Sequence, residues 1–466
     1  MSELERDRAQ IPLLHLAWPM FVENVLRASL MSVDTAMLGR YSENAVAAMS
    51  LVNQFAFFIQ LLYMTVSTGA SILITQQLGA GRRREAGLIG VGSLTLVVAF
   101  SLVVSSGFTL ATGPLIGLYG LDPEVARYAR QFLVLYGGLS FFMALNIAQA
   151  SILRAWGHTR DPMLVNVLGL VLTVLGNALC LFGPFGFPVL GVTGVAASTV
   201  FSQVVACALC FVAMRRRREL ELPLAEAARI PGRLYSAILA IGLPTAGENL
   251  AYNVSQIAIM AMLSTLGAVP LATYGIVMAV LRYVFMAGVS IGSAAQLKVG
   301  YLVGSGRHAE AKQRVYRYFA LASVCTVAAV VPLELFHRPV LGLFSDDPGI
   351  LALASTILLI AVIHEPGRNF NTVFIPALKG AGDVRFPVTM GIVSMWGVGV
   401  AGAWLLGIRL HWGLPGIWIA MAVDEWLRGL VMWRRWRSGV WQSSRRLEAA
   451  GAAVAQVAAV EIEEGI

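Results

Sequence analysis

Residues 162–214 form the longest stretch of this chain without a charged side chain. Shorter uncharged stretches cover residues 44–81, 86–121, 131–153, 249–281 and 386–408. A helix needs about 20 apolar residues to cross the ~30 Å hydrocarbon core of a bilayer. Because residues 183–188 are rich in Gly and Pro, the stretch 162–214 predicts two membrane helices joined by a tight turn. A chain built from such stretches is expected to cross a membrane repeatedly.

Composition supports this interpretation. Hydrophobic residues make up 57% of the chain and charged residues 13%, about half of the roughly 25% that soluble proteins carry. The expected fold class is an all-α membrane protein with twelve transmembrane helices. They are predicted to begin near residues 11, 45, 87, 125, 162, 191, 234, 270, 313, 349, 386 and 414.

The basic residues predict an orientation in the membrane. Arg and Lys gather in alternate connections, at residues 82–84, 154–160, 215–233, 307–317, 379–385 and 434–446. The positive-inside rule then places both termini in the cytoplasm and predicts a multi-pass protein of the inner (plasma) membrane. The same distribution accounts for the net charge of +8 without a nucleic-acid partner. The first hydrophobic stretch lacks a small-residue cleavage site, so it is expected to be a retained span.

The chain also contains an internal repeat. One constant offset along the sequence matches Pro19, Glu23, Asn24, Gly81, Arg82, Asp122, Pro123, Gly157 and Arg160 with Pro244, Glu248, Asn249, Gly306, Arg307, Asp347, Pro348, Gly382 and Arg385. This repeat predicts two homologous six-helix lobes related by a pseudo-two-fold along the membrane normal. The expected domains are an N-terminal lobe at 1–214, a cytoplasmic linker at 215–233, a C-terminal lobe at 234–440 and a cytoplasmic tail at 441–466. Two parallel lobes favour alternating-access transport over a channel, for which the sequence offers no filter-like loop.

Three short motifs resemble the multidrug and toxic compound extrusion (MATE) family. Residues 33–39 read VDTAMLG, residues 76–81 read QQLGAG and residues 378–383 read LKGAGD. The arrangement of Glu365, Arg368 and Asn371 is similar to the DinF-type branch. The resemblance implies a secondary antiporter in which H⁺ or Na⁺ entry drives export of an organic, often lipophilic and cationic, small molecule. It implies no cofactor besides the coupling ion.

The resemblance is incomplete at the family's cation sites. The family's helix-1 aspartate corresponds to Asp34, and the asparagine of its helix-5 pair is present as Asn177. The aspartate that accompanies this asparagine in many members is replaced by Leu181. In another branch, a glutamate stands where this chain has Tyr252, while Glu248 lies one turn earlier. Neither branch's coupling site is therefore expected intact.

Ionised side chains are costly within a bilayer, by about 2.5–3.5 kcal/mol on insertion scales, so each needs a partner or a use. The ion-coupling candidates are Asp34, Glu248, Glu365 and Glu23. The expected charge partners are Arg27 for Glu23, Arg368 for Glu365, and Arg282 or Lys298 for Glu248. A purely structural ion pair is the alternative for Glu23 and Glu365, and His364 is expected to pack or form a hydrogen bond. On helix 12, Arg428 is spaced to pair with Asp424 and Glu425 in a structural network.

A mixed set of polar and aromatic residues could line a substrate cavity. The candidates are Asn53, Phe57, Asn146, Asn177, Tyr252, Gln256 and Asn371. Such walls suit a lipophilic cation through cation–π and apolar contact, although the same spacing is common in helix packing. A lipid or lipid-linked oligosaccharide flippase of the same superfamily is the alternative function.

An enzyme is not expected, since the sequence has no nucleotide-binding loop, metal-ligand cluster or nucleophile motif. The four cysteines (Cys180, Cys207, Cys210 and Cys325) lie in apolar stretches without a nearby His, so we interpret them as packing residues. A monomer is expected, because a cavity between two lobes of one chain requires no partner chain.

Overall fold

The computed structural model describes residues 10–186 and 188–443, and within these ranges it contains helices and no strands. All but the first three residues of the predicted tail at 441–466 lie outside the described residues. Each of the twelve predicted spans is occupied by helix. The main helices are α1 (Leu13–Tyr41), α2 (Glu43–Gly79), α3 (Arg83–Gly117), α4 (Pro123–Gly138), α5 (Ser140–Ala155), α6 (Arg160–Phe182), α7 (Gly191–Arg216), α8 (Gly232–Ser264), α9 (Ala268–Gly304), α10 (His308–Leu335), α12 (Pro348–Gly380), α13 (Arg385–Ser394) and α15 (Gly413–Ser438).

Shorter helices fill several connections. They are the 3₁₀ segments η3 (Pro184–Gly186), η4 (Arg218–Leu220), η5 (Leu224–Arg229) and η8 (Val440–Ser443), and the α-helices α11 (His337–Leu341) and α14 (Ala401–Ala403). Among the described residues, eight helical spans are long and apolar enough to cross a membrane, and the bent pair α4–α5 raises this number to nine. Helices α1, α8 and α15 fall outside that set, and these three carry Glu23, Glu248 and Asp424. Ionisable residues thus lie on all three helices outside that set.

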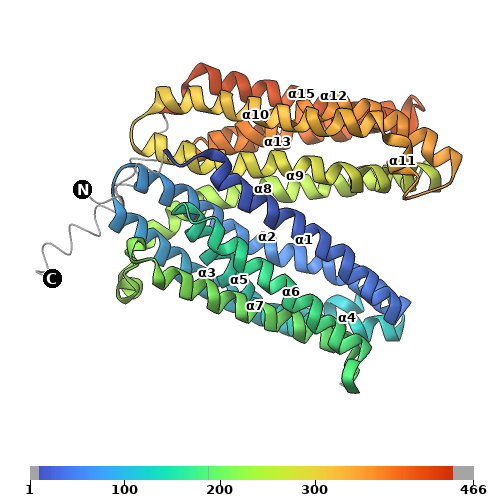
Figure 1. The fold of residues 1–466 in the computed structure, drawn as a ribbon, viewed down its shortest axis with the longest axis horizontal. Coiled ribbons are helices and arrows are strands. Elements are labelled where there is room, and N and C mark those ends of the chain that lie inside the picture. Colours follow the sequence, from blue (N-terminus) through green and yellow to red (C-terminus); the bar gives the residue numbers. More distant parts are fainter. Residues whose placement is uncertain (1–9, 187, 444–466) are drawn as a thin grey trace, which may run out of the picture. The chain divides into compact units, whose positions relative to one another are not determined.

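The described chain divides into two compact units (Figure 1). We call residues 22–243 the N-unit and residues 10–21 with 244–443 the C-unit. The divisions fall inside α1, between Phe21 and Val22, and inside α8, between Leu243 and Pro244. Each long helix therefore contributes its two ends to different units.

Each unit has its own apolar core. In the N-unit, α2 packs against α3, α4 and α5, and α6 packs against α7. Leu38, Val52, Phe132 and Val195 belong to the buried cluster between these helices. In the C-unit, α12 packs against α9, α10 and α15, around a cluster that includes Trp418. The acid Glu365 on α12 is thereby held on a helix that packs against these three neighbours.

The repeat extends to the details of helix ends. Asp122 caps α4 by accepting a hydrogen bond from the N–H of Glu124 at 2.9 Å. Asp347, at the matching position of the second half, caps α12 by accepting from the N–H of Gly349 at 2.7 Å. In both helices a proline follows the cap, at the one helical position where its missing N–H costs nothing. The matched Asp-Pro pairs are therefore helix-start signals.

The turns after α5 and α12 also match. Gly157 and Gly382 both have φ 91°, in the left-handed region that glycine enters without a Cβ penalty. In each case the following residue closes the turn, since His158 N donates to Leu153 O and Asp383 N donates to Leu378 O. The repeated glycines are thus required by the backbone.

Two spans differ from straight α-helices. Helices α4 and α5 together form one predicted span, yet they meet at a bend of 48°. Gly137 and Gly138 precede the bend and lie against the side chains of Phe108 and Thr109 on α3, where an added Cβ would make tight contacts. The span that begins at α13 contains two π-helical segments, η6 (Met395–Val400) and η7 (Trp404–Arg409). Such π segments are rare and are frequently found at functional sites.

Candidate functional site

Asp34 on α1 has an amide as its hydrogen-bond partner, whereas the other candidate acids pair with Arg or Lys. Its Oδ1 accepts a hydrogen bond from Asn177 Nδ2 of α6 at 3.0 Å, and the side chain is half-buried. Among the described contacts, no Lys or Arg pairs with it. Asn177 Oδ1 is buried and has no hydrogen-bond partner in the part of the chain that the structure describes. Leu181, one turn further on, belongs to the apolar core, so it adds no ligand.

Glu23 lies on the same helix and is bonded from three sides. Arg154 of α5 donates to Oε2 at 3.0 Å and to Oε1 at 3.3 Å. Arg27 donates to Oε1 at 3.3 Å, as its spacing predicts. Asn166 of α6 donates to Oε1 at 2.8 Å. The carboxylate of Glu23 is therefore a fixed element that joins α1, α5 and α6.

A cavity of about 330 Å³ lies beside Glu23 within the N-unit. Three predicted cavity residues, Asn53, Phe57 and Asn146, are among its lining. Its polar walls also include Gln60, Asn166, Thr173 and Gln203. Asn177 lies outside this lining, on the Asp34 contact. The volume falls within the range of about 300–1,000 Å³ typical of small-molecule sites.

The predicted partners of Glu248, Arg282 or Lys298, are wrong, because the described ion pair of Glu248 is with Lys379. Lys379 at the end of α12 donates to Glu248 Oε2 at 2.5 Å, whereas Lys298 donates to the carbonyl of Ile11 at 2.6 Å. Spacing along one helix could not show this contact, because the two residues are far apart in sequence. The repeat could have shown it, since Lys379 occupies in the second half the position of Arg154, the partner of Glu23.

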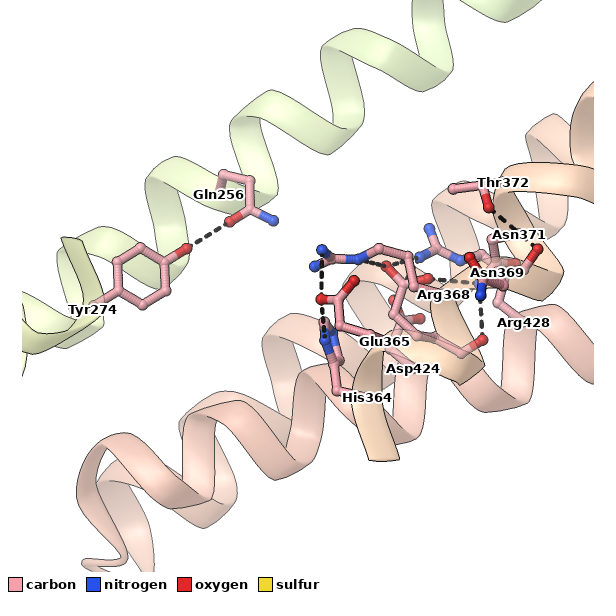
Figure 2. A network of polar contacts seen from close by, with 11 residues as sticks. Gln256, Tyr274, His364, Glu365, Arg368, Asn369, Asn371, Thr372, Asp424 and Arg428 are labelled. Carbon is pink, nitrogen blue, oxygen red and sulfur yellow. Dashed lines mark hydrogen bonds and ion pairs between the residues drawn. The ribbon is translucent and has the colours of Figure 1, made fainter. Parts of the chain in front are cut away.

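A larger polar network joins α12 and α15 of the C-unit (Figure 2). Arg368 donates to Glu365 Oε1 at 2.9 Å, which is the predicted pair. The His364 ring lies 3.2 Å from the same oxygen, as expected for a hydrogen-bonding histidine. Glu365 is nearly fully buried, so it needs these partners. Although Pro366 follows, α12 continues as one helix.

The α15 half of the network is built from the predicted trio. Arg428 lies 2.8 Å from Glu425 Oε1 and 3.3 Å from Asp424 Oδ2. Asn371 Nδ2 donates to Glu425 Oε2 at 2.6 Å, and Ser394 donates to Asp424 Oδ1 at 2.5 Å. Asn371, one of the predicted cavity residues, is thus occupied by the network.

Tyr252 and Gln256 of α8 line a much smaller cavity of about 20 Å³ beside this network. Tyr274 donates to Gln256 Oε1 at 3.1 Å on the facing helices α8 and α9 (Figure 2). Sequence spacing did not indicate that Ser394 and Asn166 would contact acids. Both lie on neighbouring helices, and short polar residues of this kind carry no periodic signal.

The cysteines and possible metal ligands give no second site. All four cysteines are free thiols, and three of them are buried. In the described ranges no group of His, Cys, Asp and Glu side chains is spaced to hold a metal ion.

An all-helical chain with many membrane-spanning helices, buried acids and a polar cavity has the architecture of a multi-pass membrane transporter. Residues 19–179 and 244–405 each match the MatE family model. The chain therefore belongs to the MatE (MATE) family, which consists of transporters and not of enzymes, and the resemblance read from its motifs is confirmed. The two matched segments also agree with the internal repeat.

Relatives align over nearly the whole chain. The uncharacterized transporter YisQ of Bacillus subtilis (strain 168) is 36% identical over 429 residues, which cover 92% of this chain and 94% of that protein. The probable multidrug resistance protein NorM of Thermotoga maritima is 28% identical over 435 residues, or 92% of both proteins.

Solved structures confirm the two-lobed helical fold. An outward-facing multidrug resistance MATE family transporter of the MOP superfamily has a TM-score of 0.84 at 19% identity, covering 96% of this chain and 98% of that chain. A MOP superfamily transporter from Pyrococcus furiosus, described by the reverse polarity of its binding pocket, has a TM-score of 0.80 at 19% identity over 94% of this chain and 96% of that one.

Proposed function

We propose that this protein is a secondary active antiporter that exports organic small molecules in exchange for H⁺ or Na⁺ by alternating access. Family membership, the two helical units and the cavity beside Glu23 support this function. The names of relatives such as NorM favour drug-like substrates. The resemblance further implies a lipophilic cation as substrate.

One observation supports Asp34 as the coupling residue. Glu23, Glu248 and Glu365 are each held by an Arg or Lys, and a neighbouring cation stabilises the ionised form of a carboxylate. Asp34 has an amide partner instead. Its charge inside a spanning helix is therefore compensated only when it binds H⁺ or Na⁺. Glu248, Glu365 and Glu23 remain the next candidates in that order. Lys379 pairs with Glu248, Arg368 with Glu365, and Arg154 together with Arg27 with Glu23.

The protein is proposed to act as a monomer in the plasma membrane with both termini in the cytoplasm. The alternation of basic connections supports this orientation. A lipid or lipid-linked oligosaccharide flippase is the alternative function, and transport assays can separate the two.

Efflux from liposomes tests the proposal. The purified protein is reconstituted with one of two xanthene dyes inside, the cation tetramethylrosamine or the anion fluorescein. Efflux is followed under a proton gradient, a sodium gradient or neither. We expect one gradient to drive efflux of one dye, and Asp34→Asn to abolish the gradient dependence because an amide cannot release a proton or hold Na⁺ by charge.

Asp346→Asn makes the same chemical change at an exposed position between α11 and α12, so it should transport like the unaltered protein. Coupled efflux that survives in Asp34→Asn would transfer the coupling role to Glu248 or Glu365. Folded protein that moves neither dye under either gradient would contradict the antiporter, and a lipid-flipping assay would then examine the alternative.

A further inference from the structure

We infer that the N-unit cavity binds organic anions, with Arg27 as the group that receives a carboxylate of the ligand. The inference rests on the proposed function in one respect, namely that the cavity is the substrate site. It replaces the expectation of a cationic substrate with a defined class, an amphiphilic organic molecule that carries a carboxylate.

The charged residues at the cavity are one carboxylate, Glu23, and two cations, Arg27 in its lining and Arg154 bonded to Glu23. Among the described lining residues Glu23 is the single carboxylate. Arg154 already neutralises it through two hydrogen bonds. Arg27, which does line the cavity, is therefore a second cation against one anion. One positive charge at the cavity wall is therefore left without a counter-charge among the described lining residues. An incoming anion would remove the excess charge, whereas an incoming cation would double it.

Arg27 is also placed to receive a ligand. Its described contacts use one of five N–H donors, on Glu23 at 3.3 Å. Its side chain is 51% exposed, against 24% for Arg154. A guanidinium presents its donors in a planar fork that matches a carboxylate. Glu23 holds one terminal nitrogen of the guanidinium, Nη2, which orients the group and leaves Nε and Nη1 to donate to a ligand.

The remaining walls suit an amphiphilic molecule. Asn53, Gln60 and Gln203 bring amide donors and acceptors, and Phe57 and Tyr136 bring aromatic surface. Aromatic rings also attract cations. A cation in this cavity would nevertheless lie near Arg27 and Arg154, and Coulomb repulsion between like charges is strong where water is sparse. The rings therefore serve the apolar part of the ligand.

The repeat supplies an internal comparison. In the second half, Glu248 and Lys379 occupy the positions of Glu23 and Arg154, and they form a one-to-one pair. The position of Arg27 is taken by Tyr252, and that of Asn166 by Gly391. At this matched position, the N-unit has a cation and the C-unit has a tyrosine. The C-unit keeps the ion pair without a second cation at that position. A structural role of the pair therefore does not explain why the N-unit has Arg27.

Binding of the two xanthene dyes tests the inference in the purified full-length protein. Fluorescence anisotropy gives the affinity for fluorescein and for tetramethylrosamine, without any gradient. Hydrogen bonds to charged groups are each worth about tenfold to a hundredfold in affinity, so we expect fluorescein to bind at least about tenfold more tightly than tetramethylrosamine. Arg27→Gln should remove this preference.

Three proteins form a charge series. Glu23→Gln raises the net charge at the site by one and Arg27→Gln lowers it by one, so fluorescein affinity should fall in the order Glu23→Gln, unaltered protein, Arg27→Gln. Arg40→Gln makes the same change as Arg27→Gln at an exposed position of α1 outside the cavity and should leave the affinity unchanged. Loss of folding in Glu23→Gln would leave the comparison of Arg27→Gln with Arg40→Gln to decide.

Equal or tighter binding of tetramethylrosamine, binding of neither dye, or fluorescein affinity unchanged in Arg27→Gln would each overturn the inference. These outcomes are distinct from failure of the antiporter. Fluorescein that binds through Arg27 but is moved by no gradient would contradict the proposed function and leave the anion site standing. Tetramethylrosamine exported in an Asp34-dependent manner, with fluorescein unbound, would support the antiporter and contradict the anion site.

Discussion

At the scale of single residues, the two halves use the same buried ion pair. Glu23 and Glu248 are matched by the repeat, and so are their partners Arg154 and Lys379. Each pair joins the first helix of a half to the end of the helix that precedes the Gly157 or Gly382 turn. A buried pair is not strongly stabilising overall, but removing one partner leaves an uncompensated charge.

Lys379→Met is expected to destabilise the protein by about 3–5 kcal/mol, the usual cost of breaking a buried pair from one side. The double variant Glu248→Gln with Lys379→Met should recover most of that loss, because neither side is then left charged. Thermal unfolding in detergent, followed by intrinsic fluorescence, measures both. Lys312→Met removes a half-buried lysine that takes no part in this pair and serves as the control. A double variant no more stable than Lys379→Met would show that the pair is not the source of the loss.

The partner of Glu248 was predictable in principle from the sequence. Glu23 and Arg27 are one turn apart, and spacing alone predicts their contact. Lys379 is remote from Glu248 along the chain, so only the repeat relates the two, through Arg154. Asn166 could not be inferred even so, since its counterpart is Gly391, whose missing side chain leaves Glu248 close to the α13 backbone.

At the scale of helices, glycines set how closely neighbouring spans approach. A Cβ added to Gly242 of α8 would meet the backbone carbonyl of Thr65 on α2, and a Cβ added to Gly69 of α2 would meet the carbonyl of Ile238. The contact is therefore reciprocal and involves backbone on both sides. Small residues at such crossings allow the dispersion contacts that hold helices together in lipid.

Gly242→Ala should cost about 1–3 kcal/mol, the typical penalty for overpacking, because the backbone carbonyl it meets cannot rotate away. Gly247→Ala changes the same helix a little over one turn further on, where a Cβ meets nothing within 4 Å, and should be neutral or slightly stabilising. The midpoint of thermal unfolding compares the two. Equal midpoints would refute the close crossing of α2 and α8.

Helix boundaries were more predictable than helix shape. The Asp-Pro pairs and the turn glycines give the starts of α4 and α12 and the ends of α5 and α12, because each acts through local backbone chemistry. The 48° bend between α4 and α5 lies where Gly137 and Gly138 contact α3, a tertiary contact that local sequence does not indicate. The π segments η6 and η7 contain no proline or other local signal, so the sequence predicted an ordinary helix there.

At the scale of the whole molecule, the uneven distribution of Arg and Lys between the connections predicts the orientation in the membrane, which the helical fold alone does not. The repeat gives both halves similar helices and similar turns, yet the basic residues decide which ends of those helices face the cytoplasm. The turn between α9 and α10 lies in a predicted cytoplasmic segment with Arg307, whereas the connection from α11 to α12 is predicted to lie on the opposite side. Ser305 and Asp346 are exposed at these two positions.

Single cysteines at these positions test the orientation. In a background where Cys180, Cys207, Cys210 and Cys325 are replaced by alanine, Asp346→Cys should react with a membrane-impermeant maleimide in intact cells, and Ser305→Cys should not. Inverted membrane vesicles should reverse this pattern, because their cytoplasmic face is outside. Solubilised protein, in which both cysteines should react, controls for local access. The opposite labelling in cells would place the termini outside and contradict the orientation that the basic connections predict.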